Sequence, residues 1–119
     1  VAGSVLTVEF ELDGHEFLAL NAGPDFTFSE AISFQIDCAD QAEVDYYWDT
    51  LSEGGEEGPC GWLKDKFGLS WQVVPAALPK LLSDPDPQRA DAAMKAMLQM
   101  RKLDIAALEQ AADRVAKPA

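Results

Sequence analysis

Apolar and polar residues alternate along the first part of the chain with the period of two that is typical of β-strands. Val5 to Leu12 and His15 to Asn21 both alternate, and Asp13-Gly14 between them is a two-residue turn signal. This turn fixes the register, so that Phe10 faces Phe17. The two surfaces then carry Val8, Phe10, Leu12, Phe17, Ala19 and Asn21 on one side and Leu18 and Leu20 on the other. We therefore expect both faces of this hairpin to be buried near its middle.

A second alternating segment precedes a helix. Ala31 to Asp37 alternates as a half-buried strand does, with its large apolar residues on one face. Asp40 and Glu43 form a capping pair that opens a helix, and Gly54-Gly55 ends it. The apolar stripe of this helix consists of Val44, Tyr47, Trp48 and Leu51, which recur at i, i+3, i+4 and i+7. The pattern predicts a strand followed by a helix that covers it.

A second hairpin follows the helix. Its strands, Cys60 to Lys64 and Leu69 to Val74, flank Asp-Lys-Phe-Gly, which we interpret as a four-residue loop closed by the glycine. With this loop length Trp62 opposes Trp71, and we expect both tryptophans in the core on the side covered by the helix. Gly61 and Leu63 then share the other face with Ser70 and Gln72. Gln72 is a polar residue in a strand that is otherwise suited to burial.

The rest of the chain has a helical pattern. Pro75 and Pro79 frame a short turn or helix, and Asp86 and Asp104 are N-caps of two further helices, the first of which has Pro87 at its first position. The predicted apolar stripes are Ala90, Met94, Met97 and Leu98 on the first of these and Ile105, Leu108, Ala112 and Val115 on the second. We expect the methionines to pack against the sheet or a second subunit rather than to form an adaptable binding surface.

The composition and net charge of the chain argue against some classes of function. A chain of 119 residues with 48% hydrophobic content fits one compact domain. Its net charge of −12 repels phosphate backbones and anionic headgroups, which argues against nucleic acid and membrane surfaces as partners. The two cysteines suggest neither a disulfide framework nor a zinc site, so the sequence predicts a reducing, cytoplasmic setting. The sequence shows neither a signal peptide nor an apolar run approaching the roughly 18 residues of a membrane span.

Four segments resemble a known family. They are residues 17–24 (FLALNAGP), 32–38 (ISFQIDC), 58–72 (GPCGWLKDKFGLSWQ) and 97–105 (MLQMRKLDI), and they are similar to PhnB-like proteins. That family belongs to the glyoxalase, bleomycin resistance and extradiol dioxygenase superfamily, also called the vicinal oxygen chelate superfamily. The resemblance implies an α+β fold of βαβββ modules whose mixed, curved sheets enclose a pocket, with a C-terminal helical extension here. Many relatives carry the label 3-demethylubiquinone-9 3-methyltransferase.

The resemblance also divides the chain into parts of a single domain, residues 1–119. Residues 1–30 correspond to the closing hairpin of a first module without its leading strand and helix, residues 31–75 to a second module, and residues 76–119 to a helical tail. The first sheet is then completed either by a leading segment or by another chain. Since unpaired strand edges invite pairing, we expect a homodimer.

Metal-dependent relatives hold a divalent ion with His, Glu or Gln side chains that project into the pocket. The corresponding positions here are Ala19, Ala31 and Gln72, which leave one neutral amide as a donor, so we expect neither a metal nor another cofactor. The only histidine, His15, is placed at the hairpin tip in solvent, and parity places Glu9 and Glu11 away from the pocket. The predicted ligand-binding residues are Phe10, Phe17, Asn21, Ser33, Gln35, Ser70 and Gln72.

The predicted ligand-binding residues favour one function, the binding of a small molecule without a metal, over three alternatives. One alternative is an enzyme, either a lyase or isomerase of the same superfamily or the methyltransferase of the label. A methyltransferase that uses S-adenosylmethionine needs a glycine-rich turn after its first parallel strand, and the sequence has none. A second alternative is that the predicted pocket residues simply fill a collapsed barrel. The third is an interaction role for the acidic surface.

Overall fold

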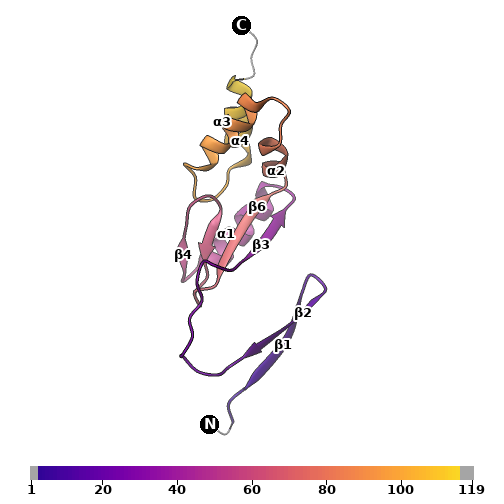
Figure 1. Cartoon of the computed structure of the whole chain (residues 1–119). Coiled ribbons are helices and arrows are strands. Elements are labelled where there is room, and N and C mark those ends of the chain that lie inside the picture. Colours follow the sequence, from indigo (N-terminus) through magenta and orange to yellow (C-terminus); the bar gives the residue numbers. More distant parts are fainter. Residues whose placement is uncertain (1–2, 116–119) are drawn as a thin grey trace.

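The computed structural model describes residues 3–115, so that the ends of the predicted domain, residues 1–2 and 116–119, lie outside the described residues. The molecule is elongated, with extents of 73 × 26 × 23 Å. Figure 1 shows three parts along this length: a hairpin at the N-terminal end, a sheet backed by a helix in the middle, and a group of three helices at the C-terminal end. The fold is therefore of the predicted α+β class.

The N-terminal hairpin has the predicted register but not the predicted burial. Strands β1 (Thr7–Leu12) and β2 (His15–Leu20) pair antiparallel with Phe10 opposite Phe17, and the turn residues Asp13 and Gly14 both have positive φ. Residues 21–32 carry the hairpin away from the body (Figure 1), so its side chains are exposed on both faces, apart from the half-buried Phe17. The expected burial of both faces is absent from the described residues, because among residues 3–115 only the contact of Phe17 with Phe34 covers part of the hairpin.

Residues 33–75 form the predicted βαβββ module. Its elements are β3 (Ser33–Cys38), α1 (Gln41–Ser52), β4 (Glu56–Glu57), β5 (Trp62–Lys64) and β6 (Ser70–Pro75). The strands form one mixed sheet in the order β3-β6-β5-β4, in which only β3 and β6 are parallel. Helix α1 covers one face, and the buried residues between helix and sheet are Cys38, Val44, Trp48, Leu63 and Val73. Strand β4 was not predicted, because two residues are too few to show an alternating pattern.

The start of α1 confirms the predicted capping pair. Asp40 accepts a hydrogen bond from the backbone N–H of Glu43 at 2.9 Å. The Glu43 carboxylate reaches back and accepts one from the backbone N–H of Ala39 at 2.7 Å. These bonds satisfy two backbone donors that have no partner within the helix. They fix the point where the chain leaves β3 and crosses the sheet.

The second hairpin has a different register from the predicted one. The backbone N–H of Asp65 donates to the carbonyl of Leu69, and that of Gly68 donates to the carbonyl of Asp65, so the loop contains three residues rather than four. The pairs are therefore Trp62 with Gln72 and Leu63 with Trp71. Because a shift of one residue moves every side chain of a strand to the other face, Trp71 lies under α1 with Leu63. Trp62 lies on the face of the sheet that α1 does not cover, the open face, so the prediction that both tryptophans are core residues is wrong for Trp62.

The C-terminal part consists of α2 (Ala77–Leu82), α3 (Pro87–Met97) and α4 (Ile105–Val115). Asp86 accepts from the N–H of Gln88 at 2.9 Å and Asp104 from that of Ala107 at 3.1 Å, which confirms both predicted N-caps. The helices surround a second core of Val74, Leu78, Leu103 and Leu108, against which Leu81, Leu82, Ala96, Met97 and Met100 pack. No helix within residues 3–115 is long and apolar enough to cross a membrane.

The buried face of helix α3 differs from the predicted one. Ala93 is fully buried, whereas Met94 and Leu98 are 39% and 56% exposed, so the predicted stripe is wrong for these two residues. The prediction is wrong there because it assigns the largest apolar side chains of the helix to its buried face. The face that meets α4 instead carries small alanines, which let the two helices approach closely.

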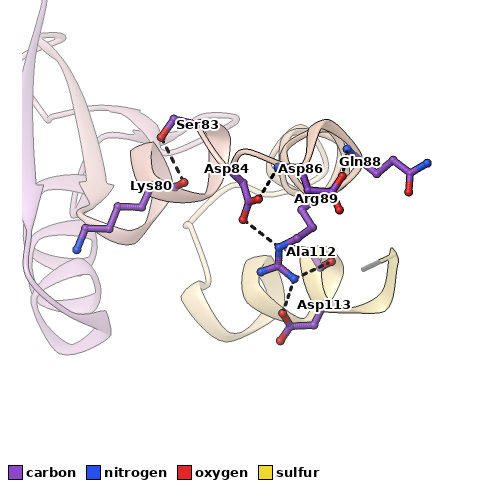
Figure 2. Close-up of polar contacts among 8 residues, drawn as sticks. All are labelled: Lys80, Ser83, Asp84, Asp86, Gln88, Arg89, Ala112 and Asp113. Atoms are coloured by element: carbon purple, nitrogen blue, oxygen red, sulfur yellow. Dashed lines mark hydrogen bonds and ion pairs between the residues drawn. The ribbon is translucent and has the colours of Figure 1, made fainter. Parts of the chain in front are cut away.

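Arg89 joins the loop before α3 to α4. Its guanidinium donates to Asp84 and to Asp113, each at 2.9 Å, and to the backbone carbonyl of Ala112 at 3.4 Å (Figure 2). The nearby Arg89 charge and the N–H of Asp86 hold the pKa of Asp84 below its usual value, the N–H contributing most. This cluster of ion pairs ties α3 and the loop before it to α4.

The tail is attached to the sheet and to α1 by backbone hydrogen bonds, by Gln41, and by an ion pair of Lys102 with Asp45 at 3.2 Å. The N–H groups of Cys60 and Gly61 donate to the carbonyls of Met100 and Arg101, both at 2.8 Å. Gln41 of α1 donates to the carbonyl of Leu103 at 3.0 Å and accepts from the N–H of Ile105 at 2.8 Å. The start of α4 is thus tied to the start of α1, and the turn before β5 is tied to the tail.

Candidate functional site

The face of the sheet that α1 does not cover is the polar one. Strand register places on it Ser33, Gln35 and Asp37 from β3, Ser70 and Gln72 from β6, and Trp62 and Lys64 from β5, together with Val74, which packs against the tail helices. Four of these side chains, Ser33, Gln72, Trp62 and Lys64, are half-buried, whereas the opposite face includes the buried core under α1. A polar face that carries one large aromatic ring is suited to contact with a small molecule.

A groove of about 570 Å³ lies along the β5 side of this face. Its walls come from the segment before β3, from β4, from the turn between β4 and β5, and from β5 and β6. The side chains that decide its chemistry are Glu30, Glu56, Pro59, Trp62, Lys64 and Ser70. The groove combines an aromatic wall, both signs of charge and a hydroxyl in a volume that suits a small organic ligand.

The turn at one end of the groove is held in an unusual backbone conformation. Cys60 and Gly61 both have positive φ, of 57° and 85°. The N–H of Gly58 donates to the carbonyl of Trp62 at 2.8 Å, and the N–H of Trp62 donates to the carbonyl of Pro59 at 3.0 Å. Together with the two bonds from Cys60 and Gly61 to the tail, these contacts fix the start of β5. The backbone of Trp62, from which its ring projects, is thus held in place.

Ser70 lies deepest in the groove lining. It is 1% exposed, and its Oγ is buried without a hydrogen-bond partner among the described residues. A buried hydroxyl without a partner costs about 1–3 kcal/mol relative to one that is hydrogen-bonded. Unpaired polar groups of this kind are uncommon in native proteins and call for an explanation such as a bound molecule.

One ion pair spans the groove. Lys64 on β5 contacts Glu30, which belongs to the segment joining the first hairpin to β3. The hydrogen bond and the charge of Glu30 raise the pKa of Lys64, with a smaller contribution from Glu56, and Lys64 in turn lowers the pKa of Glu30. Both groups therefore stay ionised at neutral pH, and the charge of Lys64 already has a partner.

The structure separates the predicted site residues into two groups. On the open face, Gln72 donates to the hydroxyl of Ser33 at 2.9 Å, Gln35 donates to Asp37 at 2.8 Å, and Ser70 lines the groove. Ser33, Gln35 and Gln72 lie on the same face as the groove without lining it.

The other three predicted residues lie on the N-terminal hairpin. Phe10 stacks on Phe17 with ring centroids 5.4 Å apart, and both line a separate depression of the hairpin. Asn21 donates to the carbonyl of Val5 at 3.1 Å at the hairpin base. Among residues 3–115, one aromatic contact between the hairpin and the body joins Phe17 to Phe34, with centroids 5.6 Å apart, and Phe34 lies on the helix side of the sheet. This chain alone therefore does not bring the two groups into one pocket.

The residues present do not fit the divalent ion of metal-dependent relatives. Of the three corresponding positions, Ala19 and Ala31 have no donor atom, and the amide of Gln72 is already hydrogen-bonded to Ser33. Within residues 3–115 no group of three or more His, Cys, Asp or Glu side chains is placed to hold an ion. A neutral amide without an imidazole or carboxylate beside it is a weak ligand for such ions.

Sequence reasoning missed Trp62 and Lys64 as residues of the open face. The signal that identifies them is in the loop, where the carboxylate of Asp65 accepts from the N–H groups of Phe67 and Leu69 and Gly68 has a φ of 88°. An Asp followed three residues later by Gly is typical of a type I turn with a bulge at the glycine, which makes a three-residue loop. That loop places Trp62 beside Gln72.

Two comparisons connect this architecture to known proteins. The sequence model of the family described as 3-demethylubiquinone-9 3-methyltransferase matches residues 1–74, which include the first hairpin and almost the whole βαβββ module. A solved structure described as a putative 3-demethylubiquinone-9 3-methyltransferase, PhnB protein, from Bacillus cereus is 31% identical to this chain. The likeness covers 62% of this chain and 67% of that one, with a TM-score of 0.55. The search of curated proteins gave no match.

The family match and the structural likeness agree with the resemblance that the four sequence segments indicate. The match covers more than half of the chain, and the shared fold is the mixed α+β fold described above. The helical tail after residue 74 lies outside the matched residues. The chain is therefore a PhnB-like member of the 3-demethylubiquinone-9 3-methyltransferase family.

Proposed function

We propose that this chain binds a small organic molecule, without the help of a metal ion, in the groove on the open face of its sheet. The observation that carries the proposal is the buried Oγ of Ser70, which lacks a partner in a groove of about 570 Å³ beside the ring of Trp62. Known ligand sites combine apolar walls with a few polar groups in volumes of roughly 300–1,000 Å³. This combination favours a binding site over a surface that simply fills a collapsed barrel.

A thermal-shift screen over metabolites and drugs tests the proposal. A ligand of the groove raises the unfolding temperature of the wild-type protein, because binding to the folded state alone stabilises it. The shift disappears in Trp62→Ala and persists in Phe10→Ala, which removes an aromatic ring from the hairpin instead. A screen without hits, or hits that depend on Phe10 and not on Trp62, refutes binding in the groove.

Metal independence is tested on the same protein. Elemental analysis of the purified chain is expected to find no stoichiometric divalent ion, since the positions that hold one in metal-dependent relatives provide only the amide of Gln72. Retention of thermal-shift hits after treatment with a chelator supports this part of the proposal. A stoichiometric ion that a Gln72→Ala variant loses contradicts it.

The family description also names a methyltransferase, and this activity is the second candidate. The parallel strand β3 leads into α1 through Ala39 and Asp40, without the glycines that let a backbone approach a nucleotide cofactor. We therefore expect calorimetry with S-adenosylmethionine to show no binding. Saturable heat of binding would favour methyl transfer over simple binding.

We further infer that the exposed hairpin pairs with a second copy of the chain. Apolar side chains on both of its faces are exposed, including Phe10 at 41% and Leu18 at 62%, and its strands have free edges. Sedimentation analysis is expected to give a dimer, and a Leu18→Glu variant a monomer. A monomeric wild-type chain refutes the inference.

The two cysteines support a reducing, cytoplasmic setting for this function. Both are free thiols, with Cys38 buried under α1 and Cys60 half-buried in the groove wall. Free thiols persist where the compartment keeps them reduced. Fractionation of the source cells, with the protein detected by antibody, tests this placement.

A further inference from the structure

We propose that the groove selects a ligand with an aromatic or apolar body and a positively charged amine. This inference rests on the proposed function, because it names the chemical class that the same groove accepts. It follows from three observations on the groove: the balance of its charges, the ring of Trp62 and the unpartnered hydroxyl of Ser70.

The charges that line the groove favour a cation. The residues that line the groove include three carboxylates, Glu30, Glu56 and Glu57, and a single cation, Lys64. Lys64 is paired with Glu30, whereas neither carboxylate of β4 takes part in an ion pair among residues 3–115. Glu56 lies directly across from Lys64, whereas Glu57 pairs with Leu63 and lies at the edge of the groove. An ammonium group that enters the groove therefore meets uncompensated negative charge.

A carboxylate ligand meets the opposite situation. To reach Lys64 it must displace Glu30, and it must do so beside Glu56, whose charge already acts on Lys64. Like charges at this distance repel, and the chain as a whole carries a net charge of −12, which also disfavours an anion. Lys64 is thus a structural partner of Glu30 rather than a receptor for anions.

The uncharged lining accounts for the rest of the ligand. The indole of Trp62 and the ring of Pro59 offer an apolar wall on which a flat ring can lie. An ammonium near the face of an aromatic ring is attracted to it as well as to the carboxylates. Ser70 also lines the groove, and its buried hydroxyl, which has no partner among the described residues, can both donate and accept a hydrogen bond.

The test compares three indole compounds that share a ring system and differ in charge: tryptamine, tryptophol and indole-3-acetate. Binding is followed by NMR titration, with the indole N–H signal of Trp62 as the reporter, assigned through Trp62→Phe. We expect tryptamine to bind about 1.5- to fivefold more tightly than tryptophol, since partly exposed charge pairs contribute about that much. Indole-3-acetate should bind most weakly. Added salt should reduce the preference for tryptamine.

Two double variants make the test specific. Glu56→Gln with Glu57→Gln should abolish the preference for tryptamine over tryptophol by weakening the binding of tryptamine. Glu9→Gln with Glu11→Gln changes the net charge by the same amount on the hairpin, where both carboxylates are exposed, and should leave the preference intact.

Each contrary outcome refutes a defined statement. If indole-3-acetate binds as tightly as tryptamine, or if the β4 variant keeps the preference, the groove does not select cations. In that case a shift of the Trp62 signal by tryptophol still supports the proposed function. If none of the three compounds moves this signal, the inference is wrong, and the metabolite screen decides the proposed function independently.

Discussion

Substitution of Gly61 by alanine tests whether the turn before β5 is the point where sheet and tail are joined. Gly61 has a φ of 85°, a conformation that costs a residue with a Cβ about 1–2 kcal/mol. A Cβ on Gly61 would also lie 2.9 Å from Cδ1 of Leu103 and 3.0 Å from the carbonyl oxygen of Val73. Leu103 is fully buried in the second core, so it has little room to move aside.

The expected loss of stability is the sum of these two effects. Overpacking in a filled core typically costs about 1–3 kcal/mol, so Gly61→Ala should reduce the free energy of unfolding by about 2–5 kcal/mol. Urea denaturation followed by tryptophan fluorescence measures this quantity, because Trp48 is 2% exposed in the core under α1. The midpoint should fall without a change in the slope of the transition.

Gly68 provides a matched control. Its φ is 88°, close to that of Gly61, but a Cβ added there has no atom within 4 Å. Gly68→Ala should therefore lose only the conformational part, about 1–2 kcal/mol. The difference between the two variants isolates the contact with Leu103 and Val73. If both variants lose the same stability within about 0.5 kcal/mol, a typical effect of an innocuous substitution, the packing argument is refuted.

Three further predictions follow from other contacts. Gln41→Ala should lower the free energy of unfolding by about 2–3 kcal/mol, because it leaves the carbonyl of Leu103 and the N–H of Ile105 without their partner. Gln88→Ala, at an exposed position, should change the free energy of unfolding little in the same urea assay. Ser70→Ala should leave the protein as stable or up to about 1 kcal/mol more stable while weakening ligand binding, and a clear loss of stability would show that the hydroxyl has a partner. Burial under α1, with a smaller effect of nearby carboxylates, raises the pKa of the Cys38 thiol to about 11. At pH 8 a disulfide reagent should therefore modify Cys60 quickly and Cys38 only when urea unfolds the protein. Equal rates of modification for the two cysteines would contradict the buried position of Cys38.

The sequence predicted most of the secondary structure, because its signals are local. The turn at Asp13-Gly14, the cap of α1 at Asp40 and the caps of the tail helices at Asp86 and Asp104 all lie where the pattern of residues places them. Each of these signals depends on contacts within a few residues, so no knowledge of the tertiary structure is needed. The order of strand, helix and hairpin in the module follows from local signals of this kind, whereas the two-residue strand β4 does not.

The site was less predictable, because it depends on register and on contacts between distant segments. The loop before Leu69 was interpreted as one residue too long, which placed Trp62 on the wrong face. The pair of Lys64 with Glu30 joins segments that are separated by more than 30 residues, and a residue pattern carries no information about it. The position of the hairpin, with Phe10 away from the groove, likewise depends on the path of residues 21–32.

The three-residue loop between β5 and β6 has a consequence for protein engineering. Because the loop length decides which tryptophan faces α1 and which faces the groove, inserting one residue into Lys66-Phe67-Gly68 would reverse the two faces of β5 while leaving its composition unchanged. A designer who wishes to alter the ligand can therefore edit the loop rather than the groove itself. An alignment that matches Trp62 with a tryptophan of a relative is informative only if both loops have the same length.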